Sequence, residues 1–378
     1  MYLTEICDVF SGFAFKSFNN DKQGTPVIKI GNINADGTMN IEECSHTTES
    51  VNAKFVSKSG DIYIALSGAT TGKVALMNVD GYYINQRVGI VRLRNDNIPI
   101  SYLYYYLLSK TRKILDDAAG AAQPNISPKQ IANYVFINRS TFEMENISNE
   151  LNTLNNAIKT KKTQLLALDE LMKSRFIEMF GTLENSIFPT YMIDDLCEFV
   201  RDGTHQTPTY TNDTINGYKF LSSKDVTTGK IDWSNIKYIP ADLHEKLYKV
   251  ISPKKGDILL AKNGTTGTAA LVDTDEVFDI YVSLALLRFK KGNNELYLLN
   301  AINSDDSKKQ FNDSLVGVGV PNLHLGKIKK VKLIIPPIEL QNEFAEFVKL
   351  IDKSKFIVQQ QIKDLEELLD SKMDEYFR

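Results

Sequence analysis

The chain has 378 residues, of which 43% are hydrophobic and 24% are charged. This length exceeds what one ordinary core supports, so two to four folding units are expected. No apolar run approaches the roughly 18 residues of a membrane span, and the start of the chain lacks the basic and apolar regions of a signal peptide. We therefore expect no membrane contact and a cytoplasmic location.

The charges are distributed unevenly. Residues 1–137 carry 13 Lys and Arg against 12 Asp and Glu, and residues 190–335 carry 19 against 18, whereas the remainder carries 12 against 17. Two near-neutral parts thus alternate with acidic segments. Any contact with DNA phosphates is expected from the near-neutral parts, with a partner supplying much of the neutralising charge.

Residues 1–137 are predicted to form a mixed, mostly β domain. Short apolar or alternating runs between turn residues predict strands at Val27–Ile30, Ile62–Leu66 and Val88–Leu93. The tyrosine-rich segment Ile100–Leu115 is predicted to be a buried helix. A platform on which nucleic-acid bases stack is the alternative for these tyrosines.

A long amphipathic helix is predicted over residues 138–181. Ser140 and Glu143 have the spacing of a capping box, and Gly181 is a typical C-terminal stop. Apolar residues recur in alternating steps of three and four, which keeps them on one seam of the helix. The seam residues are Ile147, Leu151, Leu154, Ile158, Leu165, Leu168 and Met172.

The second half follows the same plan. Residues 182–335 are predicted to form a second globular part, with strands at Lys219–Leu221, Ile258–Leu260 and Leu284–Leu287. Residues 336–378 are predicted to form a second long helix. Its seam residues are Phe344, Val348, Ile351, Val358, Ile362, Leu365 and Leu369. Two such helices most simply pair as an antiparallel coiled coil, while a helix left free for another protein is the alternative.

Four pairs of motifs repeat at offsets of 195 to 197 residues, for example from 70 to 265 and from 168 to 365. The pairs are Ser59–Ile62 with Lys255–Ile258, Thr70–Gly72 with Thr265–Gly267, Gln123–Ile126 with Val320–Leu323, and Leu168–Leu171 with Leu365–Leu368. Such a duplication predicts an internal pseudo-twofold repeat.

Motifs for catalysis fail in both halves. Ser67–Val74 resembles a phosphate-binding loop, but only three residues separate its glycines and Val74 replaces the hydroxyl that would bind Mg²⁺. Ile335–Ile338 lacks the polar and aromatic residues of an amino-methyltransferase loop. No metal site is expected from the four histidines, His46, His205, His244 and His324, or from the three cysteines, Cys7, Cys44 and Cys197. Binding is therefore favoured over catalysis.

The order of the repeated motifs resembles that of the specificity subunit of Type I restriction–modification systems, over almost the whole chain. The residues that carry this resemblance include Ser11–Lys16, Lys29–Ile33, Ser67–Gly72, Asp202–His205, Leu221–Val226 and Asn263–Gly267. The resemblance implies an α+β fold with two mixed, β-rich target recognition domains. Two long helices that form an antiparallel coiled coil would separate these domains.

The same resemblance implies a function. Each recognition domain would read one half of a bipartite, asymmetric target in double-stranded DNA. The helices would set the spacing and dock two modification subunits, which bind S-adenosylmethionine and methylate adenine. Restriction subunits would add cleavage that depends on ATP and Mg²⁺. This chain itself would hold no cofactor and catalyse no reaction.

Polar residues in the loops of a rigid sheet are the natural readers of base edges. The candidates in the first half are Lys16, Lys29, Asn32, Thr70, Thr71, Lys73, Gln86 and Arg87. The candidates in the second half are His205, Gln206, Ser222, Ser223, Lys224, Asn263, Thr265 and Thr266. A turn former or a solvated surface residue is the alternative for each. Gly68, Gly72, Gly264 and Gly267 are expected to serve backbone conformation instead.

Three other functions remain open at this stage. The chain could be the specificity chain of a Type IIG or IIB-like restriction enzyme, which again has a separate catalytic chain. It could be a coiled-coil scaffold without a role at DNA. A self-sufficient methyltransferase is disfavoured by the failed motifs.

Overall fold

The computed structural model describes the whole chain except residues 20–21, 95–96, 120–123, 227–228 and 316–321. Gln123, Val320 and Pro321, which belong to one repeated motif pair, lie outside the described residues.

Contacts group the chain into two compact units. Unit 1 comprises Met1–Thr163 and Gln359–Arg378, and unit 2 comprises Gln164–Val358. Each unit includes part of both long helices, so the division into residues 1–137, 138–181, 182–335 and 336–378 stays a prediction.

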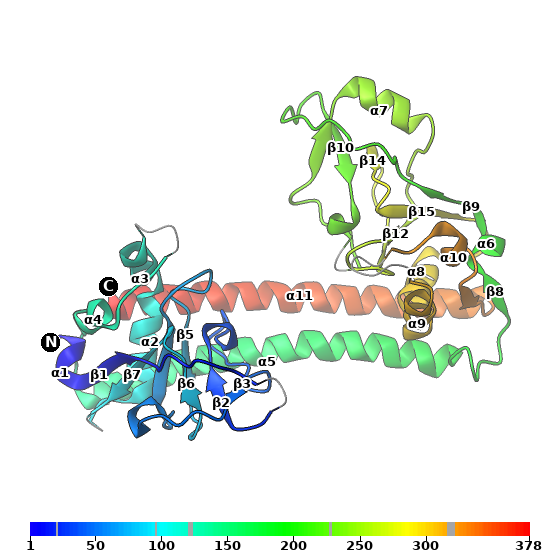
Figure 1. The fold of residues 1–378 in the computed structure, drawn as a ribbon. Coiled ribbons are helices and arrows are strands. Elements are labelled where there is room, and N and C mark those ends of the chain that lie inside the picture. Colours follow the sequence, from blue (N-terminus) through cyan, green and yellow to red (C-terminus); the bar gives the residue numbers. More distant parts are fainter. Residues whose placement is uncertain (20–21, 95–96, 120–123, 227–228, 316–321) are drawn as a thin grey trace. The chain divides into compact units, whose positions relative to one another are not determined.

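Unit 1 contains two small sheets and several helices (Figure 1). The antiparallel sheet has the order β1-β7-β4-β5 and consists of β1 (Cys7–Ser11), β7 (Val88–Leu93), β4 (Asp61–Ala65) and β5 (Val74–Met77). The second sheet consists of β3 (Ser45–Thr47), β2 (Thr25–Ile28) and β6 (Tyr83–Ile84), with β2 and β6 parallel. The helical elements before the first long helix are α1 (Leu3–Ile6), η1 (Ile30–Asn32), η2 (Ala53–Phe55), α2 (Ile100–Ser109), α3 (Thr111–Ala118) and α4 (Pro128–Ala132).

Unit 2 repeats this topology. Its antiparallel sheet consists of β13 (Ala269–Leu271), β12 (Ile258–Ala261), β15 (Leu284–Phe289) and β9 (Cys197–Asp202), in that order. Its second sheet consists of β11 (Lys237–Ile239), β10 (Tyr218–Leu221) and β14 (Phe278–Ile280), with β10 and β14 parallel. A two-stranded sheet pairs β8 (Thr190–Met192) with β16 (Lys332–Ile334). The helical elements are α6 (Ile193–Leu196), η3 (Ser223–Asp225), α7 (Ala241–Tyr248), α8 (Glu295–Asn303), α9 (Asp305–Asp313) and α10 (Leu325–Ile328). The shared strand order confirms the internal repeat predicted from the sequence.

The six predicted strands are confirmed as β2, β4, β7, β10, β12 and β15. The single helix predicted over Ile100–Leu115 is wrong in one respect, because the chain forms two helices, α2 and α3. Lys110 leaves helical geometry at the break, with φ of −90° and ψ of 3°. There the Thr111 hydroxyl donates to the Leu108 carbonyl oxygen at 2.8 Å, which satisfies a group that an uninterrupted helix would bond internally.

The tyrosines of α2 form core and not a surface platform. Tyr102 and Tyr106 are fully buried and contact the ring of Phe377, with centroids 5.1 and 6.1 Å apart. In unit 2, Tyr297 takes the place of Tyr102 and contacts Phe176 and Phe344. These rings fix each globular part to its portion of the long helices.

The two long helices, α5 (Thr141–Phe180) and α11 (Ile338–Phe377), each have 40 residues. The predicted capping box is formed, since Ser140 Oγ donates to Glu143 Oε2 at 2.6 Å and accepts from the Glu143 amide at 3.3 Å. Gly181 follows α5 with a φ of +75°, as its predicted role as a helix stop requires.

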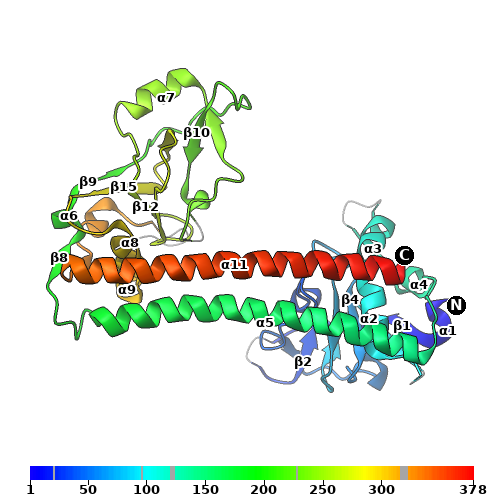
Figure 2. The same ribbon diagram turned by 180° about the vertical axis from the view of Figure 1, so that it is seen from behind.

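Within each unit, residue numbers rise along α5 while they fall along α11, so the segments run antiparallel (Figures 1 and 2). In unit 1 Glu150 bonds the Tyr376 hydroxyl, and Lys162 pairs with Glu366. In unit 2 Arg175 pairs with Glu343, and Lys355 with Asp169. Every predicted seam residue is buried or half-buried. The antiparallel pairing predicted from the heptads is confirmed in both units.

One buried ion pair occurs at the same place in both sheets. Arg92 on β7 donates from Nε and Nη2 to both carboxylate oxygens of Asp61, at 2.7 and 2.6 Å. Arg288 on β15 makes the same two bonds to Asp257, at 2.8 and 2.7 Å. Both aspartates are almost fully buried, so each pair locks two neighbouring strands.

Arg92→Ala should lower the free energy of unfolding of unit 1 by about 3 kcal/mol, because Asp61 then stays buried without its charge partner. Arg94→Ala is the matched control. It removes a pair with Asp8 in which both side chains are about half exposed, and it should cost less than about 1 kcal/mol. Urea denaturation with hydrogen exchange of the β4 and β7 amides measures both values. Equal losses for the two variants would contradict a structural role for the buried pair.

Candidate nucleic-acid interface

Each unit has a glycine-rich turn between an inner strand of its sheet and the edge strand that follows. The turn joins β4 to β5 in unit 1 and β12 to β13 in unit 2. In unit 1 the Gly72 amide donates to the Ala65 carbonyl at 2.9 Å, and in unit 2 the Gly267 amide donates to the Ala261 carbonyl at 2.8 Å. The four glycines of these turns, Gly68, Gly72, Gly264 and Gly267, have φ between +75° and +85°, which residues with a β-carbon rarely adopt. The expectation that these glycines serve backbone conformation is confirmed.

A short segment after β6 in unit 1, and after β14 in unit 2, organises the surroundings of this turn. We call Asn85–Arg87 and Tyr281–Ser283 the hub segments. Their three backbone contacts are the same in both units. The first hub residue donates to the end of β2 or β10, the second donates to the loop after β1 or β9, and the third accepts from the residue that begins the turn.

The distances of these hub contacts agree closely between the units. Asn85 donates to Ile28 at 2.9 Å, Gln86 to Phe13 at 2.9 Å, and the Leu66 amide donates to Arg87 at 2.9 Å. The corresponding bonds in unit 2 measure 2.8, 3.0 and 2.8 Å and join Tyr281 to Leu221, Val282 to Thr204, and Lys262 to Ser283. Each hub therefore brings three loops together at one end of its sheet.

The loop after the first sheet strand approaches the hub so closely that only glycine fits. A β-carbon on Gly12 would lie 2.2 Å from the Ile84 carbonyl oxygen, and one on Gly203 would lie 2.1 Å from the Ile280 carbonyl oxygen. Both glycines are at corresponding positions. They permit the loops Phe13–Phe18 and Thr204–Gln206 to begin beside the hub.

The predicted reading residues of unit 1 divide into three groups. Lys16, Gln86 and Arg87 are exposed, and Lys29, Thr70 and Lys73 are half-buried. Lys29 donates from Nζ to Ser45 Oγ at 2.9 Å and lies 3.3 Å from the centre of the Phe18 ring. Partial burial lowers the pKa of Lys29. The side chain of Thr70 has a buried Oγ1 without a hydrogen-bond partner among the described residues, so it can still accept one.

Asn32 and Thr71 form the third group and require a correction. The Asn32 carboxamide accepts from the Lys29 amide at 2.8 Å and donates to the Asn40 carbonyl at 2.9 Å. The Thr71 hydroxyl donates to the Gly68 carbonyl at 2.7 Å. Both side chains are nearly inaccessible and hold the turns that carry them. Their alternative role as turn formers is the one the structure supports.

In unit 2, His205, Gln206, Lys224 and Thr265 are exposed, and Ser222, Ser223, Asn263 and Thr266 are half-buried. Ser222 donates from its amide to Asp225 at 2.6 Å and caps η3, as Lys29 and Asn32 do at η1. The Ser223 amide donates to Ser283 Oγ at 2.9 Å, which ties η3 to the hub. The three loops that carry the predicted residues of unit 2 thus meet at its hub segment.

Sequence reasoning missed a charged cluster at this end of unit 2. Lys262 is almost fully buried, and its ammonium donates to Asp202 Oδ1 at 2.5 Å. The other oxygen of Asp202 lies 3.5 Å from Nε2 of the exposed His205. Leu66 and Ser11 occupy these two positions in unit 1. Aligning the two halves strand by strand would have revealed a lysine at a position where the other copy has leucine.

No group of three or more potential metal ligands occurs among the described residues. The three cysteines are buried and unpaired, and burial raises the pKa of Cys7 and Cys197 to about 12. None of the helices in the described part of the chain combines the length and apolar character that crossing a bilayer requires.

Gly203→Ala should lower the stability of unit 2 by roughly 2 kcal/mol, because the new methyl group collides with the backbone at Ile280. Gly326→Ala in α10 is the control, since no atom lies within 4 Å of its added β-carbon. Differential scanning calorimetry of the two variants tests the close approach. A Gly203→Ala protein as stable as the parent would show that the loop does not need glycine there.

Comparisons with known proteins bear on this arrangement. A curated relative, the Type I restriction enzyme MjaVIII specificity subunit of Methanocaldococcus jannaschii, is 25% identical over 318 residues, which cover 80% of this chain and 74% of the relative. The S subunit of a Type I restriction–modification system from M. genitalium shares the fold with a TM-score of 0.53 and 14% identity, over 100% of this chain and 95% of that one.

A second structure, from work on complex assembly and conformational transition of the type I R-M system, matches with a TM-score of 0.60 and 14% identity, over 100% of this chain and 97% of that one. The model of the family described as "Type I restriction modification DNA specificity domain" matches residues 1–170 and 188–367. The chain therefore belongs to the Type I restriction–modification DNA specificity family, as its motifs predicted.

Proposed function

We propose that unit 1 and unit 2 each read one half of a bipartite target in double-stranded DNA. The chain would thereby direct separate adenine-methylating subunits, and restriction subunits where present, to that target. The observation that carries the proposal is the pair of hubs, in which corresponding backbone bonds present different side chains.

The differences at the hubs are chemically large. The exposed Arg87 corresponds to Ser283, whose side chain is buried and accepts from the Ser223 amide, and the exposed Gln86 corresponds to the half-buried Val282. Arginine pairs with guanine through two hydrogen bonds, glutamine pairs with adenine, and valine can only make apolar contacts, as with the thymine methyl group. Equal frameworks with unequal side chains support two different half-sites, and so an asymmetric target.

The outer faces of the long helices support the proposed stoichiometry of partners. Leu171 on α5 and Leu368 on α11 occur in matching motifs, and they are 49% and 44% exposed. Each follows two acidic residues. Equivalent apolar side chains on the two copies suit two identical modification subunits, because each copy can offer the same contact.

The chemistry of the complex is assigned to those partners. The modification subunits would bind S-adenosylmethionine and methylate adenine, and restriction subunits would use ATP and Mg²⁺. This chain would contribute binding alone. The near-neutral charge of residues 1–137 and 190–335 is consistent with partners that supply much of the positive charge facing the DNA. A Type IIG or IIB-like context differs only in carrying a nuclease on the methylating chain.

Arg87→Ala in the reconstituted complex should weaken binding to the intact target about tenfold, through loss of one bidentate base contact. The variant should also tolerate base changes in one half-site while it still discriminates in the other. Arg94→Ala is the control, because Arg94 lies at the opposite end of β7. Fluorescence anisotropy with DNA targets altered in one half-site or the other measures both the affinity and the discrimination between bases. Unchanged affinity, or equal loss of discrimination in both halves, contradicts the assignment of Arg87.

Leu171→Glu and Leu368→Glu should each remove one modification subunit from the complex, and the double variant should remove both. Charge placed in an apolar contact costs more than the contact contributes. Leu166→Glu is the control, since Leu166 is 68% exposed but the corresponding residue of the second copy is Lys363. Native mass spectrometry reads the stoichiometry directly. Two modification subunits on every variant would show that these leucines do not dock partners, and a scaffold function would then need testing.

A further inference from the structure

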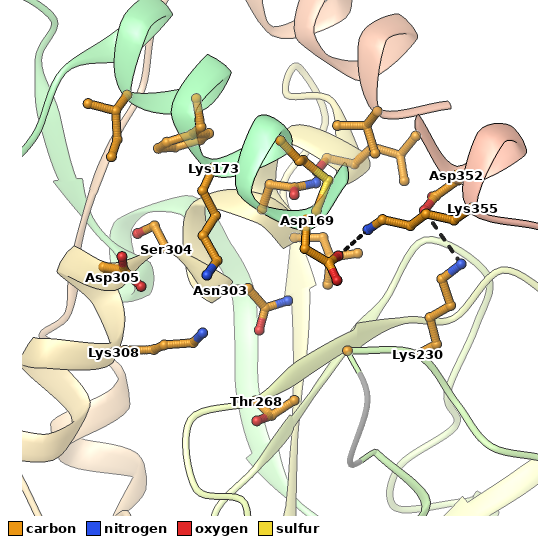
Figure 3. Close-up of a pocket in the computed structure, with 18 residues that line it drawn as sticks. Asp169, Lys173, Lys230, Thr268, Asn303, Ser304, Asp305, Lys308, Asp352 and Lys355 are labelled. Carbon is orange, nitrogen blue, oxygen red and sulfur yellow. Dashed lines mark hydrogen bonds and ion pairs between the residues drawn. The ribbon is translucent and has the colours of Figure 1, made fainter. Parts of the chain in front are cut away.

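Unit 2 contains a cavity of about 370 Å³ between its portions of the long helices and α8 (Figure 3). Apolar side chains from three helices form one wall. They are Met172 and Phe176 of α5, Leu296 and Leu299 of α8, and Val348 of α11. The volume suits a small organic molecule and not a macromolecular segment.

Charged side chains line the other side of the cavity. At one end the charges are already paired, since Lys355 pairs with Asp169 and Lys230 with Asp352 at 3.5 Å. At the other end Lys173 and Lys308 extend toward the same region, as Figure 3 shows. Lys173 pairs with Glu170 of its own helix at 2.7 Å.

Lys308 makes no ion pair within the described part of the chain, and Asp305 is the only carboxylate lining that end among the described residues. Two lysines and one carboxylate therefore line this end beside an apolar wall, and of the two lysines only Lys308 is without an ion-pair partner within the described part of the chain. An anionic group placed there would be attracted by both ammonium groups.

The same place in unit 1 is occupied by the protein's own side chains. Tyr102 and Tyr297 mark corresponding positions of α2 and α8, because each hydroxyl donates to a backbone carbonyl just before the following long helix. Tyr104 and Tyr105 of unit 1 then correspond to Leu299 and Asn300 of unit 2. The two tyrosine rings are 7% and 1% exposed, and their centroids are 5.1 Å apart.

Contacts around these tyrosines show that they fill the space. The Tyr105 hydroxyl donates to Asn152 of α5 at 3.0 Å. The Tyr104 hydroxyl oxygen lies only 2.1 Å from the position that a β-carbon on Gly37 would take. The smaller side chains of Leu299 and Asn300 leave the corresponding volume open in unit 2.

We propose that this cavity of unit 2 binds a small amphipathic carboxylate. Its apolar body packs against Met172, Leu299 and Val348, and its carboxylate lies between Lys173 and Lys308. The proposal does not rest on DNA reading, so it can fail without affecting the proposed function. Thr268, the first residue after the unit 2 turn, also lines the cavity.

Methyl NMR of the full chain labelled at methionine provides a direct test, with octanoate as the probe. The Met172 resonance should shift saturably, because its side chain lines the cavity, whereas that of buried Met77 in unit 1 should not. Octylammonium, with the same body and opposite charge, should bind at least about tenfold more weakly.

Two variants separate the apolar and the ionic contributions. Leu299→Tyr copies the side chain of unit 1 and should weaken octanoate binding at least about tenfold by filling the cavity. Lys308→Glu should do the same by reversing a charge, while Lys309→Glu, at an exposed neighbour that does not line the cavity, should stay within about twofold.

Hydrogen exchange on each variant verifies that unit 2 is folded. The proposal is overturned if Met172 does not respond to octanoate, if octylammonium binds equally well, or if neither variant weakens binding.

Discussion

The backbone hydrogen bonds of the hub segments are the constraint on which the candidate interface depends. Buried amides and carbonyls must be paired, and each hub supplies partners for three loops that would otherwise leave such groups unsatisfied. The bonds run through the main chain, so they hold whichever side chains the loops carry. The two units can therefore keep one framework and differ in the residues that face a ligand, as the exposed Gln86 and the half-buried Val282 do.

Side chains that stabilise the fold are, in contrast, the same in both units. Asp61 with Arg92 and Asp257 with Arg288 occupy matching positions and make matching bonds. Breaking either would leave a charge in the core, so neither copy can vary it cheaply. Near the hub the two copies diverge, and unit 2 even places Lys262 where unit 1 has leucine. The repeat thus separates residues that build the fold from residues free to specify a target.

The sequence predicted best those features that depend on local chemistry. The capping box at Ser140 and the heptad spacing of the apolar residues predict the long helices. The turn glycines predict a positive φ at their own positions. Features set by tertiary contacts were missed. Whether Asn32 faces a ligand or holds a turn depends on the Asn40 carbonyl nearby in space. The pairing of Lys262 with Asp202 joins residues 60 positions apart, so no local pattern reveals it.

The central claim is that two equal frameworks read two different half-sites. Sequencing of methylated adenine in DNA from cells that express this chain with its modification and restriction partners tests it most directly. A second chain, with the hub and turn residues of unit 1 moved into unit 2, provides the comparison. The account predicts a bipartite, asymmetric motif for the parent chain and a change confined to one half for the second chain. A continuous motif, or a change in both halves, would contradict it.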